Sequence, residues 1–448
     1  SFTKRRIIRM FKSVFINVLF ASYLLWITVH ILLSIFPNCY KSQETRLQHD
    51  TEIKRMTDFT SVCLKTEIYE ILYNISGERN RKTNAFPIRK NVHTLQIDHP
   101  YLCKLWAVVT ANLNPTSAVR LIASDNKWCL VIVADINSLS NEAYLTALGY
   151  RGRRIVFLDV ADQSILFSAL STALPWRHIG RKNLGYLFAI QNGAEMIWDF
   201  DYNNQGVLDI NSINNQNTMS VLQRCRGKHR LFNPYPYFGV NETYIWPRGF
   251  PLEFARDTST TPELCKATIS LKSVGVIQSI ANTEPDVDAT FRFTRDYPMS
   301  FEATQKFPFI LVPRYSYSPF NERATLWTKQ TFLYMALPIS VYGHVSDIWR
   351  SYIAQLFFHR KGVNVLFSPP FVVQTSSDRN ILEDFQAEID IYQKSNLLID
   401  FLHTFRLQPN TTLEHLYEEL YRRHFIQLED VYFIRIWIKK YREISGIN

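Results

Sequence analysis

From about residue 102 onward, the chain alternates short apolar runs with segments of helical periodicity. Apolar runs of strand length occupy residues 102–111, 128–135 and 154–160. Residues 114–124 lie between the first two runs and predict a helix, because Pro115 suits the first turn of a helix. Strands that alternate with helices predict an α/β fold with a mainly parallel sheet, covered by helices on both faces.

Two aspartates follow the predicted strands. Asp135 ends the second run and Asp159 ends the third. Ligands of such sheets bind at the carboxyl ends of the strands, which makes both residues candidates for a binding site. The alternative interpretation, in which each caps a loop, stays open.

The segment "RKNLGYLFAIQNGAEMIWDFDYNN" (residues 181–204) continues the pattern. It predicts a helix from Asn183, closed by Gly193, and then a strand over "AEMIWDF". Arg181, Lys182 and Asn183 would lie at the helix N-terminus, where free N–H groups favour an anion. Two cations there oppose the helix dipole, so either a phosphate compensates them or both side chains extend into solvent.

An Asp-Phe-Asp sequence closes this strand. Asp199 and Asp201 would share one face of an extended segment. Two close carboxylates repel each other, so they must face water or share a cation. A hard divalent ion, Mn²⁺ or Mg²⁺, held together with a diphosphate meets this need. The motif alone is common, and the plain alternative is that it merely ends a strand.

Further acids are candidates for a general base. Residues 344–358 predict a helix with Asp347 in its first turn, where it either deprotonates an acceptor hydroxyl or only stabilises the helix. Arg350 would pair with Asp347 or bind a phosphate. Asp286 and Asp288 are the second choice for the base.

Two further segments have patterns of their own. Residues 233–251 are rich in proline and aromatic residues, which predicts an irregular loop with Arg248 as an anion contact. Its aromatic side chains either stack on a sugar ring or pack on the core; they are Tyr235, Tyr237, Phe238 and Trp246. Residues 413–444 predict an amphipathic helix packed on the domain.

The N-terminal pattern predicts a membrane anchor. Residues 13–36 carry no charged side chain and would form a helix of roughly 36 Å, longer than a ~30 Å hydrocarbon core. Five cations and no acid precede them, which places residues 1–12 in the cytosol. Residues 37–93 then form a lumenal stem, and residues 94–448 the folded domain.

Composition refines this assignment. The net charge is +10, and half of it precedes the predicted anchor, so nucleic acid is not an expected partner. Asn74, Asn241 and Asn410 begin glycosylation triplets, which fit a lumenal chain. The six cysteines lack zinc-like spacing and are expected as buried thiols or disulfides, with Cys225–Cys265 as the one suggested pair.

Several blocks also carry a family resemblance. They are "GRKNLGYLFAIQNGAEMIWDFDYNN", "NPYPYFG", "WPRGFPLE", "DVDATFRFTRD", "VSDIWRSYIAQ" and "FSPPFVVQ". From about Gln96 to Tyr441 the chain resembles the STELLO-type family of glycosyltransferases. The resemblance implies a single-pass type II Golgi membrane protein with a GT-A-like lumenal domain. Plant members of this family associate with cellulose synthase complexes.

Two positions depart from the family pattern. Tyr202 follows the D-x-D pair where the family has a further aspartate, and Arg323 stands where the family has a glutamine. The pair Asp199 and Asp201 is intact. These departures bear on donor preference and efficiency more than on the fold.

Together these features predict a glycosyltransferase that moves a sugar from a UDP-sugar to a glycan or glycoconjugate with a divalent metal. Asp199 and Asp201 would bind the metal, and Asp347 would be the base. The donor contacts would be Asp135, Arg181, Lys182, Asn183, Asp199, Arg248 and Arg350. A donor half of about residues 94–250 would precede an acceptor half of about residues 251–448. The alternative is an inactive GT-A-like protein that organises a complex of glycan-synthesising membrane enzymes.

Overall fold

The structure is a computed structural model that describes residues 103–446, except 112, 150, 151, 153, 208–216, 240–243, 296–298, 302–308, 375–379 and 409. These residues belong to one unit, Arg79–Asn448. The predicted tail, anchor and stem, together with Asn74 and Asn241, lie outside the described residues. Within the described ranges, no helix combines the length and the apolar character needed to cross a membrane.

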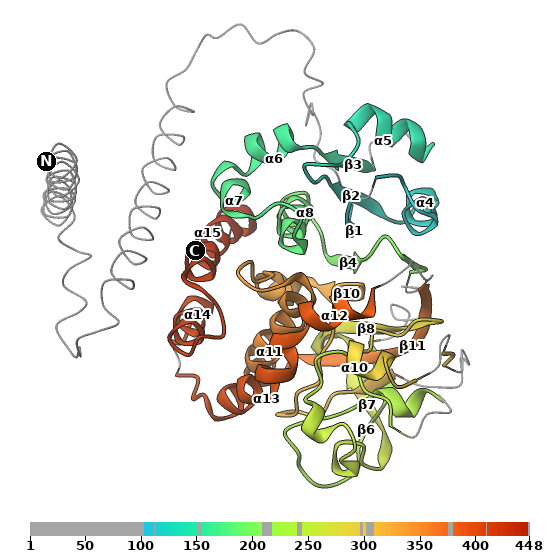
Figure 1. Ribbon diagram of the computed structural model, residues 1–448, viewed down its shortest axis with the longest axis vertical. Coiled ribbons are helices and arrows are strands. Elements are labelled where there is room, and N and C mark those ends of the chain that lie inside the picture. The colour runs from blue at the N-terminus through green and yellow to red at the C-terminus, as the bar shows by residue number, and fades with distance from the viewer. Residues whose placement is uncertain are drawn as a thin grey trace, which may run out of the picture. The chain divides into compact units, whose positions relative to one another are not determined.

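A mixed sheet runs through the centre of this unit (Figure 1). The described strands have the order β3-β2-β1-β4-β10-β8-β11-β9-β6-β7, and β5 pairs with β11. They are β1 (Leu105–Thr110), β2 (Cys129–Val133), β3 (Ile155–Leu158), β4 (Met196–Phe200), β5 (Asn204–Gln205), β6 (Thr218–Arg224), β7 (Leu264–Ser270), β8 (Val274–Asn282), β9 (Phe309–Leu311), β10 (Ala324–Thr328) and β11 (Asn364–Gln374).

The expectation of a mainly parallel sheet is correct for one part, and the rest of the sheet is mixed. In that rest, β11 is parallel to β8 and β9 is parallel to β6, beside antiparallel pairs. Strands β3, β2, β1 and β4 are parallel, as the alternating strand and helix pattern predicted. β10 is antiparallel to both β4 and β8, and β7 is antiparallel to β6. Antiparallel neighbours need no helical crossover, and irregular segments rather than helices connect much of this second part. The fold is therefore a mixed α/β architecture.

Helices cover both faces of the parallel part. α4 and α5 lie on one face, and α7, α8 and α15 lie on the other (Figure 1). The described helices are α4 (Ser117–Ser124), α5 (Asn141–Leu148), α6 (Val160–Leu166), α7 (Ser168–Ala173), α8 (Lys182–Gln191), α10 (Ala289–Arg292), α11 (Gly343–Lys361), α12 (Ile381–Ala387), α13 (Ile389–Thr404), α14 (Leu413–Arg422) and α15 (Leu428–Ser445).

α8 lies unusually close to the sheet. A Cβ on Gly185 would stand 2.6 Å from Val108 Cγ1 and 2.8 Å from Val133 Cγ2, so only glycine allows this approach. The contact holds α8 against β1 and β2, and the first turn of α8 reaches β4 through the Lys182–Asp199 contact. Lys182 therefore faces the carboxyl end of β4 instead of solvent.

The predicted elements are largely confirmed, with local corrections. β1 to β4, α4 and α8 are present, although Thr116 caps α4, which begins at Ser117 and so leaves Pro115 before the helix, and α8 starts one residue early, at Lys182. Gly193 has the positive φ (85°) expected after α8. Residues 413–444 form two helices, α14 and α15, instead of one.

The break between α14 and α15 is a Schellman turn. The Phe425 N–H donates to the Leu420 carbonyl (3.0 Å), and the His424 N–H donates to the Tyr421 carbonyl (2.9 Å). His424 has φ 59°, a left-handed conformation that glycine usually provides. Because no glycine stands at this position, the sequence pattern predicts one continuous helix and gives no sign of the break.

Two disulfides link strands of the sheet. Cys225–Cys265 joins β6 to β7, which confirms the suggested pair. Cys103–Cys129 joins the segment before β1 to β2. The division into donor and acceptor halves stays a prediction, and β6, although in the first half by sequence, lies among strands of the second.

Candidate functional site: a charged cluster at the end of β4

A group of buried charged side chains surrounds the carboxyl end of β4. Its four cations and four carboxylates come from α8, β4, α11, the loop after β6 and the segments before α10 and β10. We call it the charged cluster; its members are Lys182, Arg248, Arg323, Arg350, Asp199, Asp286, Glu322 and Asp347, each at most 9% exposed.

Lys182 joins two acids of the charged cluster. Its Nζ donates to Asp199 Oδ1 (2.8 Å), to the Phe200 carbonyl (2.8 Å) and to the Glu322 carboxylate. Burial would lower the pKa of Lys182, but the charges of Asp199 and Glu322 more than offset this and raise it. Lys182 therefore stays protonated, and the interpretation in which it extends into solvent is wrong.

The second oxygen of Asp199 is also occupied. Asp199 Oδ2 accepts from the Tyr186 hydroxyl (2.7 Å) and from Arg350 Nη1 (3.0 Å). Arg350 thus pairs with Asp199 and not with Asp347. Because the carboxylate is fully buried and both its oxygens bind cations or a hydroxyl, this geometry argues against Asp199 as a metal ligand.

Arg248 holds together the other part of the charged cluster. Its Nε and Nη2 donate to Asp286 (2.9 and 3.1 Å), and its Nη2 and Nη1 donate to Asp347 (2.7 and 3.1 Å). Burial would raise the pKa of Asp286, but Arg248 and then Arg323 more than offset it and hold that pKa below its usual value.

This arrangement changes the roles predicted for these residues. Asp347 is buried, and its oxygens also accept from the Glu322 and Ile348 N–H groups. A carboxylate with these partners is poorly placed to take a proton from an acceptor. The geometry therefore supports neither Asp347 nor Asp286 as the base, and Arg248 has no nitrogen left for an external anion.

A glycine allows the Arg248 segment to reach α11. Gly249 has φ 87°, and a Cβ there would stand 2.3 Å from Ile348 Cγ2. A larger residue would push the segment away from α11 and separate Arg248 from Asp347. The close approach thus depends on Gly249 lacking a side chain.

One cation of the charged cluster is incompletely satisfied. Arg323 lies directly before β10, and its Nη1 is 3.5 Å from Asp286 Oδ1. Its Nε and Nη1 are buried without a hydrogen-bond partner among the residues that the structure describes. Asp201, whose negative charge also acts on Arg323, is only partly buried beside it. An incoming anion would complete the hydrogen bonds of this guanidinium.

Comparisons with known proteins find likeness to one family. Residues 344–446, which contain α11 and the helices after it, match the family model described as STELLO glycosyltransferases. Over these residues the chain is similar to the STELLO family. This finding confirms the resemblance seen in the sequence blocks.

Two curated relatives come from Arabidopsis thaliana. "Probable glycosyltransferase STELLO1" is 25% identical over 400 residues, which cover 86% of this chain and 50% of the relative. "Probable glycosyltransferase STELLO2" is 27% identical over 354 residues, which cover 75% and 44%. The chain thus spans about half the length of the curated STELLO relatives it matches.

Solved structures offer only distant likenesses to this chain. A mycobacterial protein has a TM-score of 0.32 and 12% identity, covering 66% of this chain and 74% of its own. The mannosyltransferase PcManGT from Pyrobaculum calidifontis, in complex with GDP-Man and Mn²⁺, has a TM-score of 0.31 and 8% identity, covering 87% and 97%. At these scores neither likeness bears on the fold or the ligand.

Two residues predicted to bind the donor diphosphate stabilise the fold instead. Arg181 donates to Gln163 Oε1 (3.0 Å) and stacks on Trp176, with 3.5 Å between its guanidinium carbon and the ring centroid. The Asn183 side chain exchanges two hydrogen bonds with the Leu337 backbone (3.1 and 2.9 Å). Both are buried, so their predicted role has no support here.

Asp288, the other second-choice acid, is a helix cap. Its Oδ1 accepts from the Phe291 N–H (2.9 Å) at the start of α10, and its Oδ2 accepts from Trp246 Nε1 (2.6 Å). The side chain is fully buried. Its contacts support a structural role and leave no oxygen directed at an acceptor.

The strand-end aspartates divide between the two interpretations. Asp159 caps α6 through the Asp162 N–H (2.8 Å), which confirms the loop-cap alternative. Asp135 lies partly exposed after β2, and its carboxylate accepts from the Arg177 N–H (2.7 Å). Its role in donor binding stays a prediction.

The aromatic residues of the loop after β6 mostly pack on the core. Tyr235, Phe238 and Trp246 are at most 8% exposed, so they offer no open face to a sugar. Tyr237 is partly buried, and its hydroxyl donates to the Pro262 carbonyl. By contrast, Asn410 is exposed, as a glycosylation acceptor must be.

Few of the described side chains are suited to the expected metal ion. In the described part of the chain, no three His, Cys, Asp or Glu side chains are grouped to hold an ion. A single carboxylate is nevertheless enough for Mg²⁺ when substrate phosphates supply the other oxygens. Asp201 fits that role, and Asp199 does not.

Sequence reasoning missed Glu322 and Glu388. Glu322 binds Lys182, and the charges of Lys182 and Arg323 lower its pKa against the effect of burial. Glu388, directly before α13, is buried, which raises its pKa to about 7. Glu322 adjoins Arg323, which the sequence did single out, whereas Glu388 lies in an ordinary amphipathic pattern that gave no signal.

Proposed function

We propose that the chain is a glycosyltransferase that transfers a sugar from a UDP-sugar to a glycan or glycoconjugate. The family supports the general class of reaction. The observation that carries the assignment of the site is Arg323, a buried guanidinium at the end of β4 with two unsatisfied nitrogens. A diphosphate supplies the oxygens that this group lacks, and negative charge grows on the diphosphate as the glycosidic bond breaks.

In this proposal Arg323 and Asp201 are the donor contacts. Arg323 meets the diphosphate directly through its free N–H groups, a geometry that favours phosphate recognition. Asp201 would hold Mn²⁺ or Mg²⁺ together with the diphosphate, and the ion would neutralise the leaving group. The other members of the charged cluster keep both residues in place.

Arg323 stands where the family pattern has a glutamine, and this difference fits the proposed donor contact. A glutamine, which the family pattern has at this position, would offer a neutral amide where Arg323 offers a charge. An arginine neutralises part of the diphosphate charge without a third carboxylate for the metal. This compensates for Tyr202, which replaces that carboxylate in the family pattern.

UDP binding by the full chain tests the proposal. Thermal stability is followed with UDP, with and without Mn²⁺; UDP at 100 times its dissociation constant adds about 2.7 kcal/mol. Arg323→Gln should weaken the binding of UDP at least tenfold. Asp201→Asn should remove only the additional stabilisation that Mn²⁺ gives in the presence of UDP. Arg226→Gln, at an exposed arginine, is the matched control and should change neither.

Two outcomes contradict the proposal. A folded chain that binds no nucleotide diphosphate would remove the donor site altogether. The second outcome is that Asp199→Asn removes the effect of Mn²⁺ without lowering stability, whereas Asp201→Asn does not. This result would mean that Asp199 is the metal ligand. UDP-sugar turnover with candidate acceptors then separates a transferase from a binding protein.

A second candidate function is supported by the pairing of charges within the charged cluster, which needs no ligand. Asp199 and Asp347 are fully paired within the protein, as expected of charges that serve only the fold. This favours an inactive GT-A-like protein that organises glycan-synthesising membrane enzymes. Nucleotide binding without turnover for any acceptor would support this candidate.

We further propose that the domain lies in the Golgi lumen on a single-pass type II anchor. The exposure of Asn410 is compatible with glycosylation there. Glycan removal by endoglycosidase, compared between the native chain and Asn410→Gln, tests this placement. A chain without glycans at Asn410 in a secretory host would count against it.

A further inference from the structure

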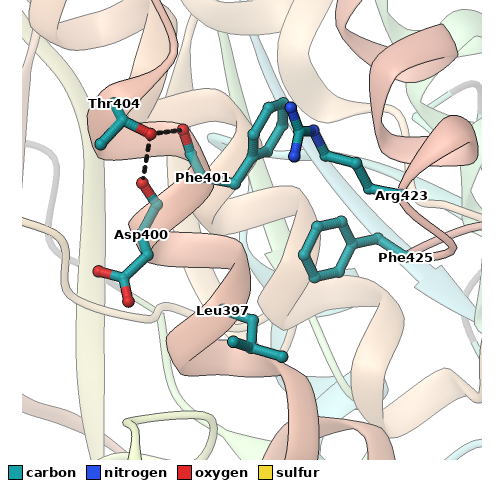
Figure 2. Close-up of a pocket in the computed structure, with 6 residues that line it drawn as sticks. All are labelled: Leu397, Asp400, Phe401, Thr404, Arg423 and Phe425. Atoms are coloured by element: carbon teal, nitrogen blue, oxygen red, sulfur yellow. Dashed lines mark hydrogen bonds between the residues drawn. The ribbon is translucent and has the colours of Figure 1, made fainter.

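An open pocket lies beside α13, far along the chain from the charged cluster. It has a volume of about 530 Å³, within the usual range for ligand sites. We call it the α13 pocket; Leu397, Asp400, Phe401, Thr404, Arg423 and Phe425 line it (Figure 2). Four of these come from α13, and two come from the turn after α14.

The walls of the α13 pocket are mainly apolar. Phe401 and Phe425 stack with ring centroids 6.2 Å apart and planes 25° apart. Phe425 also meets Trp349 of α11 edge-on at 5.9 Å, which fixes its ring. Leu397 is 58% exposed, so a large apolar side chain is presented to any ligand that enters.

One cation of the α13 pocket has no acidic partner. The Arg423 guanidinium lies 4.4 Å from the Phe401 ring centroid (Figure 2). It makes no hydrogen bond or ion pair with another residue of the described part. An arginine held flat on an aromatic ring keeps its N–H groups at the edge, preorganised to bind a carboxylate.

The single acid of the α13 pocket does not neutralise this charge. Asp400 forms an ion pair with Arg230, and its carboxylate points away from Arg423 (Figure 2). Arg406, an exposed cation, lies two residues after Thr404 in the sequence. The pocket therefore complements a negatively charged ligand.

The lining favours a peptide over a saccharide. The Thr404 hydroxyl donates to the Asp400 and Phe401 carbonyls of its own helix (2.8 and 3.1 Å). Leu397, Phe401 and Phe425 offer no hydrogen bonds, so the hydroxyls of a sugar would be left unpaired at a cost. An apolar side chain fits these walls, and a neighbouring carboxylate fits Arg423.

We propose that the α13 pocket docks a segment of a partner protein that presents a large apolar side chain next to an acidic residue. The apolar side chain packs against Leu397 and Phe425. The carboxylate of the neighbouring residue accepts a bidentate hydrogen bond from Arg423. This interaction does not depend on donor binding at Arg323.

Short labelled peptides added to the full chain test the proposal. The probe is acetyl-Phe-Asp-Asp-amide, compared with the Phe-Asn-Asn and Gly-Asp-Asp versions by fluorescence anisotropy. The Phe-Asp-Asp peptide should bind at least tenfold more tightly than either. Arg423→Gln should weaken it at least tenfold, about 1.4 kcal/mol, and Leu397→Ser should weaken it severalfold.

Arg422→Gln is the matched control, because Arg422 is the adjacent exposed arginine and pairs with Glu419. It should change peptide binding less than twofold. Equal losses in both arginine variants, or no binding of Phe-Asp-Asp at millimolar concentration, would overturn the proposal. A glucuronate disaccharide that binds through Arg423 while the peptide does not would assign the pocket to acidic glycans instead, which also overturns it.

Discussion

Two arginines show how differently the same side chain is used in this molecule. Arg248, in the charged cluster, is 2% exposed and divides its three side-chain nitrogens between Asp286, Asp347 and the His344 carbonyl. Arg423, in the α13 pocket, is exposed, lies on an aromatic ring and has no acidic partner in the described part. Arg248 has no N–H group left to donate to a ligand, whereas the N–H groups of Arg423 are available.

The comparison separates fold chemistry from binding chemistry. Removing one partner from a buried ion pair leaves a charge without compensation, so the members of such a pair are tied to stability. An exposed guanidinium without a partner contributes little to the fold but can gain a ligand. Arg323 has an intermediate position, since it is buried like Arg248 but keeps two nitrogens without a hydrogen-bond partner.

The largest expected effect is that of Arg248→Met. It leaves Asp347 buried without its cation and Asp286 with only the more distant Arg323, so the free energy of unfolding should fall by about 3–5 kcal/mol. Urea denaturation of the full chain measures the loss. Arg423→Met should change stability by less than about 1 kcal/mol; similar losses in the two variants would contradict the distinction between them.

Glu388 connects the two regions, and its pKa gives the second prediction. The residue precedes α13, its Oε2 accepts from the Ala289 N–H (2.8 Å), and Arg248, Asp288, Tyr392 and His344 face it. Burial raises its pKa from 4.5 to about 7, so the folded state binds more protons than the unfolded state between these values. Its contribution to stability is complete below about pH 4.5 and is lost as the pH rises to about 7.

Glu388→Gln removes this titration and keeps an oxygen for the Ala289 N–H. Relative to the wild type, the variant should gain up to about 3 kcal/mol of stability between pH 4.5 and 7.5. Denaturation midpoints at several pH values measure the difference. A difference between the two chains that stays constant with pH would show that Glu388 titrates normally.

The parallel part of the fold could be predicted because its signals are local. Unbroken apolar runs at residues 128–135 and 154–160 become β2 and β3, and the helical spacing after Asn183 becomes α8. The strand directions in the rest of the sheet could not be predicted, since β10 is antiparallel to β4 and β8 while β11 is parallel to β8. Such pairings depend on tertiary contacts that no local period reveals.

The candidate site was predicted in its members but not in their roles. Six residues chosen from the sequence, Lys182, Asp199, Arg248, Asp286, Asp347 and Arg350, do meet in the charged cluster. They were chosen because they are charged and lie next to predicted strand ends, helix starts or loops. The sequence could not show that they neutralise one another, because pairing depends on burial and on distances between distant segments.

The smallest expected effect concerns the turn that shapes the α13 pocket. His424 adopts φ 59° at the Schellman turn between Arg423 and Phe425, a conformation that costs a side-chain residue more than glycine. His424→Gly should raise stability by at most about 1 kcal/mol, whereas the β-branched His424→Val should lower it by about 1–2 kcal/mol. Thermal midpoints measure both changes. Because glycine keeps the turn, His424→Gly should bind the Phe-Asp-Asp peptide as the wild type does; a tenfold loss would mean that the histidine itself, and not only Arg423, binds the peptide.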